Sequence, residues 1–391
     1  MPDYKDIRFL ESISNLREIL HRNSGTQLSA ERGNQISVCL EQGRLLSEAA
    51  QNVGWEIKPL LVYYGMTGFA KAISLWREFG KLESLPQRHG LRDVSDSTLI
   101  EEMKVKIEGD GTFQRLNNSC SKLEKLIFHD SKDKLRISVP TTESAFLDGK
   151  EITLREILAR IPGLEDLYRQ TFRTEPELLQ CSHFSLNHSN KQMVEFTVHN
   201  PPLFTEMAML SQCIEGLRRR FPFLRHWRVR YAAPTMGVTF TNLAIDNNAE
   251  IPPYSSHRDP GHFELATQIM IDPSSGKSQL IPPISFSVKE LGDHCQPVRG
   301  NLTPHFIEST CVIGAWNGLF LSEVSLYYLG MFLLSSLLRY RPYIWANAIA
   351  RRSFPEKPLD DHALALIEAF IDLSLTVFPQ ATVIAINEPF P

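Results

Sequence analysis

The segment from Trp55 to Leu75 constrains the fold most, because its apolar residues recur at the spacing of an α-helix. Pro59 suits an early helical position, where the missing backbone N–H is not needed. The apolar positions that continue the pattern are Ile57, Leu60, Leu61, Tyr64, Phe69, Ala72 and Leu75. Gly65 and Gly68 would let a second helix approach closely. We therefore expect a central helix over residues 58–79.

Both ends of the chain have helical patterns. Helices are predicted over residues 6–21 and 30–53 before the central helix, and over 323–340, 343–350 and 360–377 near the other end. Thr153 is a candidate N-cap for a helix that starts at Leu154, because Glu156 lies in the first turn. Pro162 and Gly163 would end that helix.

The middle of the chain is rich in strand patterns. Strands are predicted over residues 193–198, 227–231, 237–244, 265–271, 280–288 and 310–313, with a helix-like stretch over 201–220. The turn Asp272–Lys277 contains Pro and Gly, so it predicts a hairpin between the strands on either side of it. Residues 103–150 are read as loops with small strands over 104–108 and 135–139.

These patterns predict a mostly helical α+β protein. We expect the N-terminal region (1–100) and the C-terminal region (318–391) to share one core, with a mixed β-containing middle unit over 101–317. The helix over 58–79 should pack beside the helix over 323–340.

Composition excludes several function classes. A net charge of -4 argues against a surface coated in positive charge for non-specific DNA binding. The six cysteines contain no Cys-x-x-Cys pair and are expected to be reduced thiols. The N-terminus lacks the apolar stretch of a secretory signal, and the apolar run over 324–338 is too short to span a bilayer. A cytoplasmic protein without a membrane segment is expected.

Two motifs carry a family resemblance. The first joins Tyr63-Tyr64-Gly65 to Arg88-His89-Gly90-Leu91, and the second is the apolar helix from Tyr328 that ends in Arg339-Tyr-Arg-Pro-Tyr-Ile-Trp345. Together they resemble the YaaC-like bacterial proteins. The resemblance implies a bacterial cytosolic protein, and it brings no agreed catalytic set.

Arg88 and His89 form the first candidate site, because an Arg and a His beside a long helix resemble the HEPN ribonucleases. There a His acts as general acid or base and an Arg holds the scissile phosphate without a metal. The spacing departs from that pattern, since Arg77 is too far from His89 and Arg88 is adjacent to it. The alternative is a loop in which His89 bonds the backbone and Gly90 makes a turn. The motif Arg220–His226 has suitable spacing, but Pro222 interrupts a helix there.

His257, Asp259 and His262 supply ligand types for a transition metal, with His294 or His305 as further donors. The alternative is a polar surface turn, and no metal site is assigned. A kinase is rejected, because Glu264 stands where the catalytic-loop Asn belongs and no Gly-rich loop precedes it. Phosphate-binding loops and a Gly-x-Ser-x-Gly elbow are absent from the sequence, so no cofactor is implied.

The third candidate is a composite binding site. Guanidinium groups and aromatic faces of the second motif could hold phosphates and stack bases, and residues of the central helix would face them if the two motif helices pair. The residues are Tyr63, Tyr64, Lys71, Arg339, Tyr340, Arg341 and Trp345. The alternative reading is a helix crossing or a protein interface.

The sequence does not decide whether the chain is an enzyme. The first hypothesis is a binding or partner-regulated component, with a protein partner or a homo-oligomer expected. The second, which makes RNA the ligand, is a HEPN-like metal-independent endoribonuclease that uses Arg88 and His89, in stress or phage defence by analogy.

Overall fold

The computed structural model describes residues 4–121, 125–129, 134–138, 141–186, 193–198, 207–221, 228–233, 237–244, 269–271, 278–280, 285–286, 310–349 and 362–388. The chain forms two compact units. Unit 1 comprises Met1–Leu123, Thr142–Pro176 and Leu321–Pro391, and unit 2 comprises Glu124–Thr141 and Glu177–Phe320. Unit 1 therefore contains both ends of the chain.

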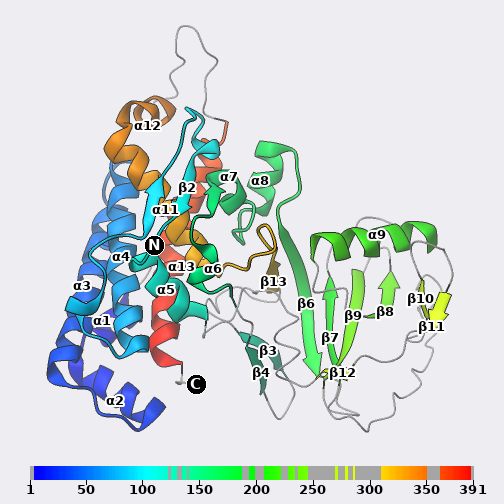
Figure 1. Ribbon diagram of the computed structural model, residues 1–391, viewed down its shortest axis with the longest axis horizontal. Helices are drawn as coiled ribbons and strands as arrows, with labels where there is room; N and C mark the ends of the chain where they lie inside the picture. The colour runs from blue at the N-terminus through cyan, green and yellow to red at the C-terminus, as the bar shows by residue number, and fades with distance from the viewer. Residues whose placement is uncertain are drawn as a thin grey trace. The chain divides into compact units, whose positions relative to one another are not determined.

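Unit 1 is mostly helical (Figure 1). Its helices are α1 (Lys5–Leu10), α2 (Ile13–Ser24), α3 (Ala30–Gln51), α4 (Lys58–Glu78), α5 (Thr112–Ser121), α6 (Ser144–Leu147), α7 (Leu154–Leu158), α8 (Glu165–Phe172), α11 (Glu323–Tyr340), α12 (Pro342–Ile349) and α13 (Leu364–Asn387). Two short 3-10 helices, η1 (Leu82–Ser84) and η2 (Ile100–Glu102), lie between α4 and α5.

The central helix α4 packs closely on α3, as the small residues predict. A Cβ built at Gly68 would lie 2.9 Å from the carbonyl oxygen of Cys39 and 2.9 Å from the backbone nitrogen of Gly43. Gly65 faces Gly43 and Ser47 in the same interface. Backbones this close leave no room for a side chain, so glycine is required on this face of α4.

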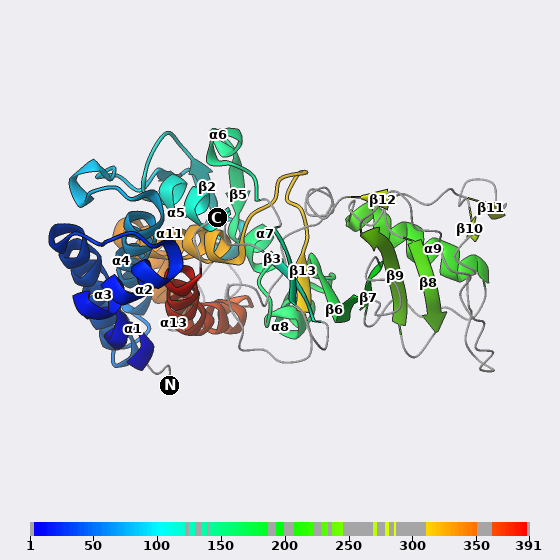
Figure 2. The same cartoon turned by 90° about the horizontal axis from the view of Figure 1, so that it is seen from below.

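The N- and C-terminal helices share one core, which confirms the predicted fold class. Tyr63 on α4 contacts Tyr328 and Phe332 on α11, with ring centroids 5.4 and 5.8 Å apart. Tyr327 stacks on Phe370 of α13 at 5.4 Å and an interplanar angle of 14°. Figure 2 shows α11 and α13 beside the N-terminal helices.

Helix α13 is long and apolar enough to cross a membrane by length and composition, but 61% of that window is buried inside the structure. A core helix passes the same test. The sequence predicted that this helix ends at Val377, yet it continues past Pro379 to Asn387. Burial of Phe378, Ala381 and the residues beyond stabilises the last turns in spite of the proline.

A small antiparallel sheet of three strands completes unit 1, in the order β1 (Leu91–Asp93), β2 (Lys104–Ile107) and β5 (Glu151–Thr153). The capping box predicted at α7 is present: the Thr153 side chain accepts from the Glu156 backbone N–H, and the Glu156 carboxylate accepts from the Thr153 backbone N–H. The prediction for residues 103–150 was wrong at two points, because residues 112–121 form α5 and residues 144–147 form α6.

Unit 2 is built on an eight-stranded sheet whose main path runs β12-β9-β7-β6-β3-β4, with β13 pairing β6 and β8 pairing β9. The strands are β3 (Lys125–His129), β4 (Lys134–Ser138), β6 (Leu178–Leu186), β7 (Met193–Val198), β8 (Arg228–Ala233), β9 (Gly237–Ala244), β12 (Ser285–Phe286) and β13 (Thr310–Ile313). The predicted hairpin is confirmed by antiparallel pairing of β10 (Ile269–Ile271) with β11 (Ser278–Leu280). Helix α9 (Met207–Arg220) lies beside β8 and β9 (Figures 1 and 2).

The two units do not divide the chain at residues 100 and 317. Helix α5, strand β5 and helices α7 and α8, which the sequence assigns to the middle region, cluster with the helices of both chain ends.

The predicted helix over 6–21 is two helices, α1 and α2, because Ser12 caps the second by accepting from the Asn15 backbone N–H.

Candidate functional site

His89 lies in the loop that enters β1, and the start of α5 fixes this loop. The backbone N–H groups of Thr112 and Phe113 donate to the carbonyls of Arg88 and His89, each at 3.0 Å. These are two of the N–H groups that have no partner within a helix. Gly90 has a φ of 72°, and the Gln114 side chain donates to its carbonyl at 2.9 Å. Gly90 thus bends the chain as the alternative reading expected, whereas the hydrogen bond of the His89 ring goes to the Tyr63 side chain and not to the backbone.

The His89 side chain ends a chain of buried hydroxyl groups. Tyr63 Oη lies 2.7 Å from His89 Nδ1 and 3.4 Å from Tyr328 Oη. Tyr328 Oη lies 3.3 Å from Thr67 Oγ1, and the Thr67 hydroxyl donates to the Tyr63 carbonyl at 2.9 Å. Two helices and one loop therefore meet through four polar side chains.

Hydrogen-bond donation along this chain has a fixed direction at one end. A backbone carbonyl only accepts, so the Thr67 proton is committed to Tyr63 O and Thr67 Oγ1 accepts from Tyr328. The Tyr63 proton then has two acceptors, His89 Nδ1 and Tyr328 Oη, and the nitrogen is nearer. Donation to Nδ1 places the proton of neutral His89 on Nε2.

Burial and charge keep this imidazole neutral. Burial lowers the pKa of His89, and the positive charges of Arg339 and Lys71 lower it further. Burial also raises the pKa of Tyr63 and of Tyr328, so both phenols keep their protons. Phe332 packs against His89 with ring centroids 5.9 Å apart.

Lys71 and Arg339 approach His89 from opposite ends of the paired helices. Contacts of Tyr63 with Phe332, Thr67 with Tyr328 and Trp55 with Trp345 show that α4 and α11 run antiparallel. Side chains on a helix lean toward its N-terminus, so both cations lean toward the level of Tyr63. The Arg339 Nε bond to the Ser335 carbonyl, at 3.3 Å, fits this direction.

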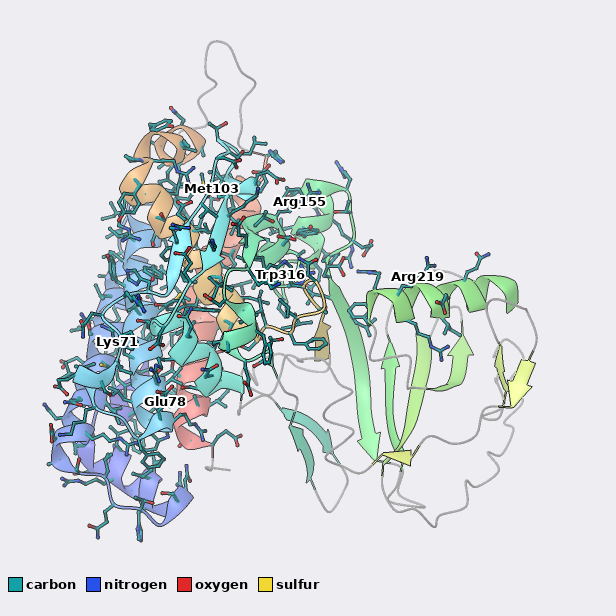
Figure 3. All side chains as sticks on the ribbon, in the orientation of Figure 1. Lys71, Glu78, Met103, Arg155, Arg219 and Trp316 are labelled. Carbon is teal, nitrogen blue, oxygen red and sulfur yellow. The ribbon has the colours of Figure 1, made fainter. Side chains whose placement is uncertain are left out.

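Neither cation has a counter-charge in the part of the chain that the structure describes. No carboxylate there lies within ion-pair distance of Lys71 or Arg339. Lys71 is half-buried on α4 (labelled in Figure 3), and Tyr64, 37% exposed, lies two turns before it on the same solvent-facing stripe. We call Tyr63, Tyr64, Lys71, His89 and Arg339 the motif cluster.

Family comparison agrees with the motifs that build this cluster. The family model of YaaC-like proteins matches residues 8–386, which is nearly the whole chain. The chain belongs to the YaaC-like protein family. No curated protein and no solved structure matches it. The family description names no activity, and the fold of this YaaC-like protein does not by itself imply one.

The structure separates the predicted binding residues of this YaaC-like protein into two groups. Arg341 donates to both carboxylate oxygens of Asp93, at 2.9 and 3.1 Å, and so ties the end of α11 to β1. Trp345 is buried, and its Nε1 donates to the Trp55 carbonyl at 2.8 Å. Both are held by structural contacts. Tyr340 is 72% exposed, with the Arg339 guanidinium 5.1 Å from its ring centroid.

Arg88 and His89 point to different partners. The Arg88 guanidinium donates to the Asp110 carbonyl, whereas His89 contacts Tyr63 and Phe332. Among the described residues, the two side chains share no hydrogen-bond or ring-contact partner. Arg77 donates to the Glu388 carbonyl at 3.1 Å, at the end of α13.

Sequence reasoning missed Thr67, Tyr328 and Phe332 as parts of the site. Thr67 follows Tyr63 by one helical turn, which is a usable signal. Tyr328 was quoted only as the start of the second motif. The metal hypothesis on His257, Asp259 and His262, with His294 and His305, lies outside the described residues, as does His226. The described residues contain no group of three or more His, Cys, Asp or Glu that could hold a metal.

Proposed function

We propose that this YaaC-like protein is a binding component that takes an anionic ligand on the motif cluster. The observation that carries the proposal is the pair Lys71 and Arg339. Their positive charges lower the pKa of His89, and neither has a carboxylate partner in the described part of the chain. Both positive charges act on the same imidazole, and like charges in one site repel each other. A bound anion would turn that repulsion into attraction.

The proposal keeps a protein partner or a homo-oligomer as the expected means of regulation, and the bacterial cytoplasm as the place of action. Both rest on the family resemblance and on the sequence. The exposed Tyr340 beside Arg339 is compatible with a partner surface, because aromatic and Arg side chains are enriched at interfaces.

Isothermal titration calorimetry of the full-length protein with pyrophosphate tests the binding role. The double variant Lys71→Gln/Arg339→Gln should bind pyrophosphate at least about tenfold more weakly, since each lost charge-assisted hydrogen bond contributes about 1.5–3 kcal/mol. Arg17→Gln removes an exposed cation from α2 and should leave binding unchanged. Wild-type protein that does not bind pyrophosphate, or a double variant that binds it equally well, contradicts the proposal.

The rival proposal is a HEPN-like, metal-independent endoribonuclease in stress or phage defence, with Arg88 and His89 as its residues. The half-buried His89, hydrogen-bonded to Tyr63 through Nδ1, is the observation that favours the rival, and a base at Nε2 requires the tautomer in which Nδ1–H donates to the Tyr63 hydroxyl. Incubating wild type and His89→Ala with total RNA in EDTA separates the two. Cleavage that persists in chelator and disappears in the variant supports the nuclease, whereas intact RNA in both samples leaves the binding role.

A further inference from the structure

The motif cluster offers hydrogen-bond donors to a ligand. We assign the Tyr63 proton to His89 Nδ1, the nearer of its two acceptors, and this assignment gives neutral His89 a donor at Nε2. Lys71 adds an ammonium group and Arg339 adds the guanidinium nitrogens that its bond to Ser335 leaves over. No carboxylate of the described residues pairs with either cation, so no acceptor of that kind accompanies them.

A site with donors alone selects for the protonation state of its ligand. An oxyanion that still carries a proton needs an acceptor for it, whereas a fully ionised oxyanion presents only acceptors. Two cations also match a charge of two. A phosphate monoester carries a charge of about −1.5 to −2 at neutral pH, while a diester carries about one negative charge per phosphate.

Tyr64 extends the cluster with an aromatic face. Its side chain is 37% exposed and its ring centroid is 5.6 Å from that of Tyr63. On α4, positions 64 and 71 are separated by two turns and differ by about 20° in direction, so the ring and the ammonium group share one solvent-facing stripe. An aromatic ring at such a place can stack on a planar ligand group.

We propose that the ligand is a phosphate monoester, held through its terminal, fully ionised phosphoryl group by Lys71, Arg339 and His89, with a planar aromatic portion against Tyr64. This inference rests on the proposed binding function and deepens it. A nucleoside monophosphate and the phosphorylated end of a nucleic acid strand both have this chemistry. An internal phosphodiester does not, because its phosphate is monoanionic and both ester oxygens are blocked.

Two small probes isolate the terminal phosphoryl group. Phenyl phosphate is a dianion at about pH 8, since the second pKa of a phosphate monoester is about 6, and methyl phenyl phosphate keeps the ring but has one charge fewer. Both are titrated into the full-length protein and followed by calorimetry. Phenyl phosphate should bind at least about tenfold more tightly, and the difference should shrink in Lys71→Gln.

Tyr64→Ala tests the aromatic contact, and the exposure of Tyr64 makes this variant tolerable to the fold. It should weaken the binding of phenyl phosphate at least about fivefold and leave the binding of pyrophosphate unchanged, because stacking contributes about 1–3 kcal/mol. Equal binding of monoester and diester overturns the inference while the binding function stands. An unchanged affinity of Tyr64→Ala for phenyl phosphate overturns the aromatic part. Failure of pyrophosphate and of both phenyl probes to bind overturns the proposed function itself.

Discussion

At the scale of single residues, His89 owes its character to groups far away in sequence. Tyr63 is 26 positions from it, and Tyr328 is 265 positions from Tyr63, yet the three side chains form one chain of polar contacts. Burial has the largest effect on the His89 pKa, followed by Arg339 and then Lys71. All three lower the pKa below its ordinary value, which favours the neutral imidazole.

Removing either cation should raise the pKa of His89. We expect Arg339→Gln to raise it more than Lys71→Gln does, because Arg339 has the larger effect of the two. An NMR titration of the imidazole in each variant measures the change, with Arg17→Gln as a control that leaves the pKa where it was. A His89 pKa that neither substitution changes would show that the charges of Lys71 and Arg339 do not influence the imidazole.

The same lowered pKa makes stability depend on pH. In the unfolded chain His89 returns to about 6.5, so below that pH the unfolded state binds more protons than the folded state. The contribution of His89 to the free energy of unfolding is therefore complete above about pH 6.5 and decreases as the pH falls toward the folded value. Urea denaturation from about pH 7.5 to 5.5 should have a weaker pH slope in His89→Gln than in wild type.

At the scale of elements, the sequence predicted the helices that have a strong apolar period. The α4 prediction of 58–79 differs from the observed Lys58–Glu78 by one residue, and its glycines admit a second helix closely as expected, although that helix is α3 and not the motif helix α11. Helix α5 was missed because its sequence, Thr-Phe-Gln-Arg-Leu-Asn-Asn-Ser-Cys-Ser, is poor in helix formers. The carbonyls of Arg88 and His89 accept hydrogen bonds from its first turn, and helix propensities do not include such contacts with distant residues.

Substitution of Gly68 by alanine should destabilise unit 1. The new Cβ would lie 2.9 Å from the Cys39 carbonyl and from the Gly43 nitrogen, and backbone atoms cannot rotate away. Overpacking of this kind costs about 1–3 kcal/mol, which exceeds the roughly 1 kcal/mol by which alanine is favoured over glycine in a helix.

Chemical denaturation followed by circular dichroism measures the change, with the same substitution at Gly216 of α9 as the control. Nothing lies within 4 Å of a Cβ built there, so Gly216→Ala should be neutral or stabilising. A Gly68→Ala variant as stable as wild type would mean that α3 and α4 separate at little cost.

At the scale of the whole molecule, the sequence predicted which ends share a core but not where the units divide. The apolar period of 323–340 was visible locally, and its predicted pairing with α4 is present, although the glycines of α4 that suggested this pairing pack on α3. The assignment of α5, β5, α7 and α8 to unit 1 depends on contacts such as the 2.9 Å hydrogen bond from Ser325 to Asn117, which links positions 208 residues apart. No window of sequence contains both partners.

The longer segment of unit 2, Glu177–Phe320, has its beginning and its last strand side by side. Leu178 on β6 pairs with Ile313 on β13, and the Gly314 N–H donates to the Glu177 carbonyl at 2.8 Å. The core of unit 1 is supplied by its own segments, among them the stacked rings of Tyr327 and Phe370. The shorter segment of unit 2, Glu124–Thr141, also has adjacent ends, because Lys125 pairs with Ser138. We therefore expect unit 1 to fold when short Gly-Ser linkers replace residues 178–313 and 125–138.

The shortened protein should unfold cooperatively and bind pyrophosphate as the full chain does, because Lys71, His89 and Arg339 all belong to unit 1. Circular dichroism and calorimetry on the purified protein measure the two properties. A shortened chain that is folded but does not bind would assign part of the ligand contact to unit 2. A chain without a cooperative transition would show that the helical core depends on residues of unit 2. A linker by itself should not disturb the core, because it only joins two chain ends that already lie side by side.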